Sequence, residues 1–185
     1  MKSKAEVIRE QLAELRVLDI GGAGYGADNP YEKELREAWS LTKQRFTVDL
    51  SDRADWRINL NQLPLPSIEA NQWDIATAFD VLEHLEHPVE VLKWIPTQKL
   101  LVSLPNSLSC FCRRMEQTGF EHLYSFTWYT AGVLLARGGW KVEKYYYTFG
   151  KWSRLAKMIN WIGSLVPSRI GTGLVIHCVR TKTEG

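Results

Sequence analysis

The sequence lacks several features that would assign it to a common functional class. It has 23 Lys and Arg against 21 Asp and Glu, so its net charge at pH 7 is only +2. This balance gives no electrostatic reason to expect a nucleic-acid partner, although it does not exclude RNA. No stretch reaches the roughly 18 apolar residues of a membrane span. Segment 1–14 is charged and lacks the apolar core of a signal peptide. We therefore expect a cytoplasmic protein.

Cysteine is also scarce. The three cysteines are Cys110, Cys112 and Cys178, and an odd number with two of them one residue apart is a poor framework for disulfides. Cys110 and Cys112 also lack the spacing of zinc ligands. Internal repeats and low-complexity segments are absent. A chain of this length favours one domain, which we expect to span 1–185.

What the sequence does contain is an alternation of apolar runs and helix-prone segments. Strands are predicted at 16–20, 45–50, 56–60, 73–79, 99–104, 141–149 and 174–181, and helices at 4–14, 31–41, 88–95 and 127–137. This alternation predicts βαβ units around a parallel sheet. No ordinary crossover helix separates the last two strands, so a closing hairpin is expected at one sheet edge. The predicted fold is α/β and Rossmann-like: a doubly wound, mostly parallel seven-stranded sheet with an antiparallel edge strand and helices on both faces.

Segment 151–170 is predicted to be an amphipathic helix inserted before the last strand. Its residues 151–169 combine apolar side chains such as Trp152 and Trp161 with basic ones such as Lys151 and Arg154. A helix of this kind usually covers the sheet or an acceptor pocket. It could also make peripheral contact with a membrane surface, which would suit a lipid-like acceptor.

The first predicted strand ends in a glycine cluster. Glycine lets the backbone turn sharply and lets a ligand approach closely. A carboxylate buried at this point, as expected for Asp19, needs a cationic ligand or backbone N–H donors as partners. It would repel phosphates bound at a helix N-terminus. However, Gly22-x-Gly24-x-x-Ala27 also fits a nicotinamide-dinucleotide pattern, and a tight strand-to-helix turn alone could explain the glycines. All three interpretations stay open.

The second predicted strand ends in Asp49, whose carboxylate could accept the hydroxyls of a ribose. It follows Asp19 by 30 residues (49 − 19), which is longer than the usual unit. The alternative interpretation is a surface-turn residue that precedes Ser51.

The most specific motif is WDIATAFDVLEHLEHP at 73–88. It strongly resembles a segment of the class I S-adenosylmethionine-dependent methyltransferases, and is most similar to the group that includes the ubiquinone-biosynthesis O-methyltransferases. Five further segments match in the same order: VLDIGGAGYG (17–26), VDL (48–50), INLNQLPLP (58–66), LVSLPN (101–106) and HLYSFT (122–127). The resemblance covers roughly 15–150.

This resemblance implies S-adenosylmethionine as the methyl donor. The implied donor-binding residues are Asp19, Gly21, Gly22, Gly24, Asp49, Leu50, Asn59, Leu60, Phe79, Asp80 and Val81. The sequence departs from the family pattern at Ala23, where the second loop glycine is usual, and at Asn59, where Asp is common. Asn59 can still hydrogen-bond an adenine amine through its carbonyl oxygen.

Methyl transfer from a sulfonium needs alignment of nucleophile and methyl carbon more than it needs a catalytic triad. His84 and His122 are the candidate catalytic residues, because a general base assists a hydroxyl acceptor. Some quinone O-methyltransferases with a similar segment bind a divalent cation, and Asp80, Glu83 and His84 fit that spacing. The preferred interpretation is a structural turn without a metal.

The predicted function is methyl transfer from S-adenosylmethionine to a small-molecule, glycan or lipid-like acceptor. Two alternatives remain. A nicotinamide-dinucleotide-binding oxidoreductase would explain the glycine pattern, and a non-catalytic donor-binding scaffold would explain its irregularity. The sequence does not determine the methylated atom or the oligomeric state.

Overall fold

The computed structural model describes residues 2–23, 30–69, 72–109, 122–148 and 171–181. It contains one seven-stranded sheet with the order β3-β2-β1-β4-β5-β7-β6. The strands are β1 (Arg16–Ile20), β2 (Gln44–Asp49), β3 (Trp56–Arg57), β4 (Ile75–Phe79), β5 (Lys99–Pro105), β6 (Trp140–Thr148) and β7 (Gly173–Arg180). The helices are α1 (Lys4–Gln11), α2 (Pro30–Trp39), the short 3-10 helix η2 (Leu82–His84), α3 (Pro88–Trp94) and α5 (Trp128–Arg137).

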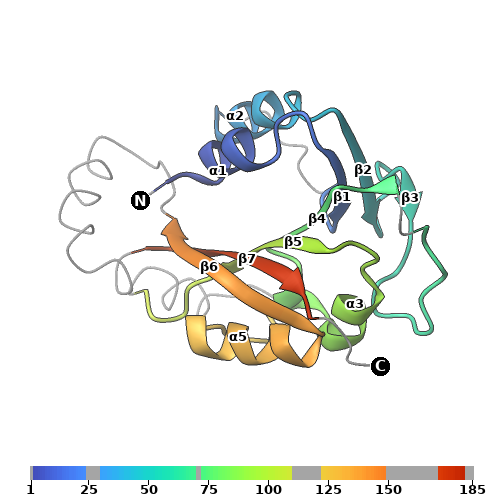
Figure 1. Ribbon diagram of the computed structural model, residues 1–185, viewed down its shortest axis with the longest axis vertical. Helices are drawn as coiled ribbons and strands as arrows, with labels where there is room; N and C mark the ends of the chain where they lie inside the picture. Colours follow the sequence, from blue (N-terminus) through green and yellow to red (C-terminus); the bar gives the residue numbers. More distant parts are fainter. Residues whose placement is uncertain (1, 24–29, 70–71, 110–121, 149–170, 182–185) are drawn as a thin grey trace.

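The sheet lies between two layers of helices (Figure 1). Helices α1 and α2 cover one face, and α3 and α5 cover the other. Strands β1 and β4 are buried on both faces, which explains why their sequences are continuous apolar runs and do not alternate. The helix predicted at 4–14 is the shorter α1, which begins at a capping box formed by Ser3 and Glu6.

The late strands confirm the predicted antiparallel pairing. Strand β7 pairs antiparallel with β6 and also with β5, from Lys99 opposite Val179 to Pro105 opposite Gly173. The antiparallel strand therefore lies second from the edge, and β6 is the edge strand. Because β7 runs opposite to both neighbours, β6 is parallel to β5. The carboxyl ends of β1, β2, β4, β5 and β6 consequently lie side by side. The row of strand ends that they form is called the carboxyl edge of the sheet below.

A few expectations differ from the structure or fall outside it. The third strand covers only Trp56–Arg57 of the predicted 56–60. The amphipathic segment 151–170 lies outside the described residues, as do Cys110 and Cys112, whereas Cys178 is a buried free thiol. Within the described part of the chain, no helix has both the length and the apolar character to cross a membrane.

Candidate functional site

The turn after β1 lies against the ends of two neighbouring strands. The Gly21 N–H donates to the Val48 carbonyl at 2.7 Å, and the Ala23 N–H donates to Asp49 Oδ2 at 3.2 Å. Gly21 has φ +73°, and a Cβ there would lie 2.4 Å from a Val81 methyl carbon. Only glycine fits this position, because the turn must bend sharply while it contacts Val81, two residues after the end of β4.

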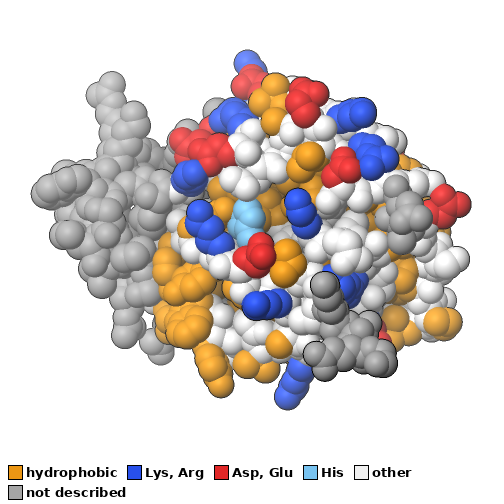
Figure 2. All heavy atoms as spheres, viewed as in Figure 1, with side chains coloured by type: hydrophobic (Ala, Val, Ile, Leu, Met, Phe, Trp, Pro, Cys, Tyr) orange, Lys and Arg blue, Asp and Glu red, His pale blue; other side chains and the backbone are white. Residues whose placement is uncertain are grey.

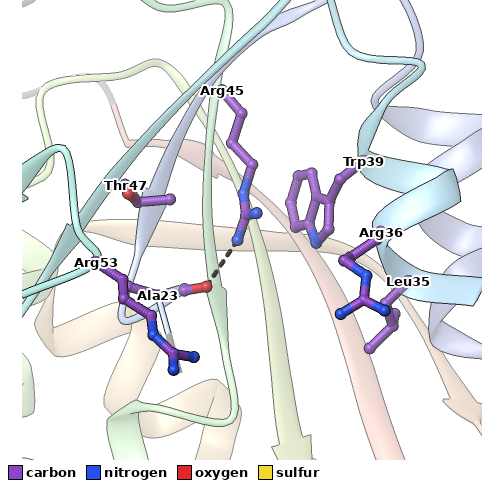
Figure 3. Close-up of a pocket in the computed structure, with 8 residues that line it drawn as sticks. Ala23, Leu35, Arg36, Trp39, Arg45, Thr47 and Arg53 are labelled. Atoms are coloured by element: carbon purple, nitrogen blue, oxygen red, sulfur yellow. Dashed lines mark hydrogen bonds between the residues drawn. The ribbon is translucent and has the colours of Figure 1, made fainter. Parts of the chain in front are cut away.

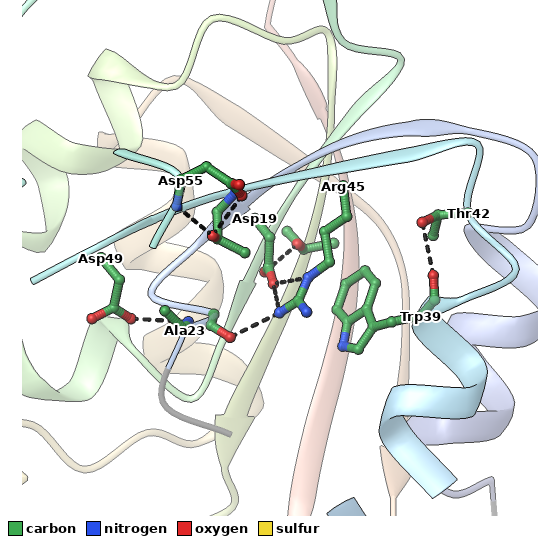
Figure 4. Close-up of polar contacts among 10 residues, drawn as sticks. Asp19, Ala23, Trp39, Thr42, Arg45, Asp49 and Asp55 are labelled. Atoms are coloured by element: carbon green, nitrogen blue, oxygen red, sulfur yellow. Dashed lines mark hydrogen bonds and ion pairs between the residues drawn. The ribbon is translucent and has the colours of Figure 1, made fainter. Parts of the chain in front are cut away.

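Asp19, at the end of β1, is bound by other side chains (Figure 4). It is 1% exposed; Arg45 donates to its Oδ2 at 2.8 and 2.5 Å, and Thr77 donates to Oδ1 at 2.6 Å. Arg45 also donates to the Gly22 carbonyl at 2.8 Å. Burial raises the pKa of the Asp19 carboxyl, while Arg45 and Thr77 oppose the rise. The required partner is thus an arginine within the fold, and Asp19 holds the glycine turn in place through it. Contact between Asp19 and the donor stays a prediction.

Asp49 lies where the resemblance places a ribose-binding acid. Its Oδ1 accepts the Ser51 N–H at 2.9 Å, while its Oδ2 accepts the Ala23 N–H. Each carboxylate oxygen has a second lone pair. Asp49 can therefore brace the glycine turn and still accept a hydroxyl.

The other predicted donor-binding residues differ in exposure. Leu50 is 58% exposed, Leu60 is buried, and Asn59 is exposed with its side-chain oxygen accepting the Asn61 N–H at 3.0 Å. Phe79 is buried, and Gly24 lies outside the described residues.

A pocket of about 190 Å³ borders the glycine turn on the side that faces α2 (Figure 3). Its lining consists of Gly22, Ala23, Leu35, Arg36, Trp39, Arg45, Thr47 and Arg53. Three guanidinium groups line this space, although the charge of Arg45 is compensated by Asp19. The guanidinium of Arg53 gives the pocket a positive charge, which suits an anionic group and disfavours a sulfonium.

Asp80 follows β4 and is held from two directions. Ser103 donates to its Oδ1 at 2.6 Å, and Lys4 of α1 forms an ion pair with its Oδ2. Partial desolvation of this carboxyl, whose side chain is 41% exposed, would raise its pKa, but Lys4 and Ser103 outweigh that effect and lower it. Asp80 also has φ +52°, a region that non-glycine residues rarely adopt. Its carboxylate is thus ionised and anchored to the first helix.

Glu83, His84 and His122 form a cluster beside Asp80. One ligand atom from each lies within 4.8 Å of the others, and the two imidazole centroids are 4.7 Å apart. Glu83 is 0% exposed, and neither of its carboxylate oxygens has a hydrogen-bond partner among the described residues. Burial, followed by the charge of Asp80, raises the pKa of Glu83 to about 8.

Backbone hydrogen bonds bring His122 to this cluster. The N–H groups of Leu123 and Tyr124 both donate to the Glu83 carbonyl, at 2.7 and 3.3 Å. The loop before α5 is thereby fixed to the turn after β4. The structure therefore joins the two candidate catalytic histidines, which are far apart in sequence, and adds Glu83 to them.

An aromatic surface flanks the cluster at the same edge of the sheet. We define it by the exposed side chains Leu123, Tyr124, Trp128, Tyr129 and Tyr145. The Trp128 and Tyr145 rings are stacked, with centroids 5.9 Å apart. Figure 2 shows hydrophobic side chains gathered at the lower left, over the beginning of α5 and the adjoining part of β6. Aromatic groups of this kind suit an apolar or ring-bearing ligand.

The strand order, with β7 antiparallel between β5 and β6, and the glycine turn after β1 define a Rossmann-like α/β fold. No family model and no curated protein matches the sequence. The chain is similar in structure to an S-adenosylmethionine-dependent methyltransferase from Mesorhizobium loti (13% identity, 95% of each chain covered, TM-score 0.60). The predicted methyltransferase fold is thereby confirmed.

Two further solved structures have the same fold and belong to methyltransferases of two different acceptors, a small RNA and a porphyrin. One is the small RNA methyltransferase HEN1, with 17% identity, a TM-score of 0.60, and 97% of this chain and 24% of that chain covered. The other is the magnesium protoporphyrin IX methyltransferase of Synechocystis with bound SAH, with 13% identity, a TM-score of 0.58, and 96% and 80% covered. At these identities the likeness establishes the fold and leaves the acceptor open.

Proposed function

We propose that this chain transfers a methyl group from S-adenosylmethionine to an oxygen atom of a small-molecule, glycan or lipid-like acceptor. One observation carries the proposal: a braced glycine turn and a Glu83–His84–His122 cluster lie at the same carboxyl edge of the sheet. Ligands of open α/β sheets bind at this edge. The edge therefore offers a donor side and an acceptor side next to each other.

On the donor side, the residues present fit an adenosyl group. Gly21 and Gly22 let the turn pack against the Val81 and Asp19 side chains, and Asp49 can accept ribose hydroxyls while it binds Ala23. The donor would supply a methyl group already activated by the positive sulfonium. The role of the chain is then to hold that methyl in line with the acceptor oxygen.

On the acceptor side, the imidazoles are the groups suited to take a proton from an acceptor hydroxyl. His122 lies half-buried and His84 lies exposed, so both lie at the rim of the cluster. A neutral imidazole is an effective base near neutral pH. The aromatic surface beside them supports a ring-bearing or lipid-like acceptor.

The experiment combines calorimetry with a transfer assay. Micromolar binding of S-adenosylmethionine and of its demethylated product is expected, followed by transfer of labelled methyl to phenolic or catecholic acceptors in preference to their amine analogues. His122→Ala should lower kcat by roughly 10² to 10⁴-fold with little change in donor affinity. His87→Ala, which removes an exposed histidine outside the cluster, is the matched control. Donor binding without transfer to any acceptor would instead support the scaffold alternative.

The arginine-lined pocket favours a second candidate, a dinucleotide-binding oxidoreductase. Arg53 lines the same pocket as Gly22, where a pyrophosphate would meet positive charge. Titration with NAD and NADP in the same calorimeter separates the two functions. Tight dinucleotide binding without sulfonium binding would reject the methyltransferase proposal.

A further inference from the structure

The pocket between α2 and β2 contains a buried N–H donor without an acceptor. Trp39, the last residue of α2, is 6% exposed, and its indole Nε1 has no hydrogen-bond partner among the described residues. Buried polar groups in native proteins are almost always hydrogen-bonded, and an exception points to a missing water or ion. Figure 3 shows the indole nitrogen on the side of the ring that faces the pocket. The wall of the pocket therefore offers a hydrogen bond that nothing in the described fold accepts.

Arg45 of β2 offers a second donor beside this indole. Its Nε and Nη2 bind Asp19 and the Gly22 carbonyl at 2.5 to 2.8 Å, whereas no described residue accepts a hydrogen bond from its Nη1. The guanidinium carbon lies 4.3 Å from the centroid of the Trp39 ring, so the two side chains are packed together. A guanidinium carries its five N–H groups in a rigid plane. The bonds to Asp19 and Gly22 thus hold Nη1 in position before any ligand arrives, which lowers the cost of binding.

Arg53 brings positive charge to the same pocket. Its exposed guanidinium has no ion-pair partner among the described residues. The charge of Arg45 is balanced by Asp19. Asp55, the acid nearest to the lining residue Thr47, binds the N–H and the hydroxyl of that threonine through its Oδ2 and does not line the pocket. An anion in the pocket would therefore meet the charge of Arg53.

The volume and the donors of the pocket define the class of ligand that it can take. The pocket measures about 190 Å³, whereas sites for drug-sized ligands occupy about 300 to 1,000 Å³. It is therefore too small for a whole dinucleotide or a whole methyl donor. Its donors come from α2, from β2 and from the loop between β2 and β3, and they face the space from different sides (Figure 3). A tetrahedral oxyanion, whose oxygens point in different directions, suits this arrangement better than a planar carboxylate.

We propose that Trp39, Arg45 and Arg53 bind a phosphate group, either as inorganic phosphate or as the end of a small phosphate monoester. Trp39 Nε1 and Arg45 Nη1 each donate a hydrogen bond to a phosphate oxygen, and Arg53 adds a charge-assisted contact. The site borders the glycine turn from the α2 side and is separate from the proposed methyl-donor site at the carboxyl edge of the sheet. Phosphate binding therefore requires neither the methyl donor nor methyl transfer.

The first experiment adds inorganic phosphate to the isotope-labelled full-length chain and follows its indole N–H signals by NMR, without methyl donor. We expect a saturable shift of the Trp39 signal, which is identified by its loss in Trp39→Phe, and one phosphate per chain by calorimetry. Trp94 and Trp140 are internal controls, because their Nε1 atoms already donate to the carbonyls of Pro66 and Leu92. A folded chain whose Trp39 signal does not move at millimolar phosphate overturns the site.

The second experiment compares phosphate affinities of variants by calorimetry. Arg53→Gln should weaken binding about tenfold, because a charged hydrogen bond is lost. Arg57→Gln is the matched control, since Arg57 pairs with Asp52 and does not line the pocket, and it should bind as the parent does. Trp39→Phe keeps an aromatic ring but loses the N–H, and should weaken binding about fivefold. Parent-like affinity in Arg53→Gln, or in a folded Trp39→Phe chain, overturns the assignment.

The third experiment identifies the source of the phosphate group. Tighter binding of glycerol 3-phosphate than of inorganic phosphate would support a monoester, and the reverse would support the free ion. NAD that moves the Trp39 signal at lower concentration than either would mark a pyrophosphate site and overturn the small-ligand assignment. Displacement of phosphate by the demethylated product of the methyl donor would overturn the separation of the two sites. A chain that binds phosphate but not this product would support the phosphate site and reject the proposed function alone.

Discussion

Two carboxylates are buried near the carboxyl ends of the parallel strands, and their surroundings differ. Asp19, at the end of β1, is bound by Arg45 and Thr77, whereas Glu83, just after β4, has no hydrogen-bond partner for its oxygens among the described residues. Both are almost inaccessible, at 1% and 0% exposure. A compensated buried charge serves the fold, because breaking its pair leaves a costly charge behind. A buried carboxylate without such a partner is retained where a ligand or a proton neutralises its charge. The comparison therefore separates a structural acid, Asp19, from a functional one, Glu83.

The largest effect should come from removing the compensating charge of Asp19. Arg45→Met leaves that carboxylate buried without its cation and should lower the free energy of unfolding by about 4 kcal/mol at pH 7. Urea denaturation followed by circular dichroism measures the loss. The double variant Asp19→Asn with Arg45→Met should recover part of it. A loss below about 1 kcal/mol would show that the pair does not stabilise the fold.

At Glu83 we expect a change of comparable size and opposite sign: substitution of this residue should raise the free energy of unfolding at alkaline pH. The pKa of Glu83 is raised from its usual value of 4.5 to about 8 in the folded chain, mainly by burial. Between these two pH values the folded state keeps a proton that the unfolded state releases. Stability is therefore fully present below pH 4.5 and falls as the pH rises to about 8. Glu83→Gln should remove this decline and exceed the parent in free energy of unfolding by about 4 kcal/mol at alkaline pH.

The measurement is denaturation with chelator present across pH 5 to 9. The charged and titratable groups around Glu83 are Asp80, Lys4, His84 and His122, and the variant leaves all four unchanged. Glu86→Gln, at an exposed position, should keep the pH dependence of the parent. Parallel curves for the parent and Glu83→Gln would contradict the prediction.

The smallest effect concerns the remaining partner of Asp19. Thr77→Val removes the 2.6 Å hydrogen bond but keeps the shape and the arginine. Because the acceptor is charged, the expected loss is about 1.5 kcal/mol. Thermal and urea unfolding should agree on this value. A loss as large as that of Arg45→Met would mean that the hydroxyl, and not the guanidinium, compensates the carboxylate.

Much of the fold could be predicted because its signals are local. The strand at 16–20 has the predicted bounds, and the helix predicted at 88–95 is α3, because an apolar run and an N-terminal proline mark them. The range predicted for the third strand, 56–60, was too long, because only Trp56 and Arg57 pair with β2. The position of β7 second from the edge depends on contacts with β5 that no local pattern encodes.

The site was predicted less completely, because its important contacts join distant residues. The motif after β4 identified Asp80, Glu83 and His84, and His122 was recognised as a candidate. Nothing in the sequence pairs Asp19 with Arg45 or Asp80 with Lys4, because the first pair depends on the packing of β1 and β2 and the second on the packing of α1 against the end of β4. The charge of Lys4 in a mostly apolar, buried helix face was the one available signal.

The place of β7 has a consequence for how the chain is made. During synthesis β6 leaves the ribosome before β7. Until β7 follows, β6 lacks its partner, because β7 is the only strand it pairs with in the described part of the chain. A nascent chain halted upstream of Gly173 would expose the free backbone groups of β5 and β6 together. Unpaired strands of this kind aggregate readily. Premature termination near the end of the message should therefore yield an insoluble product instead of a soluble shortened chain.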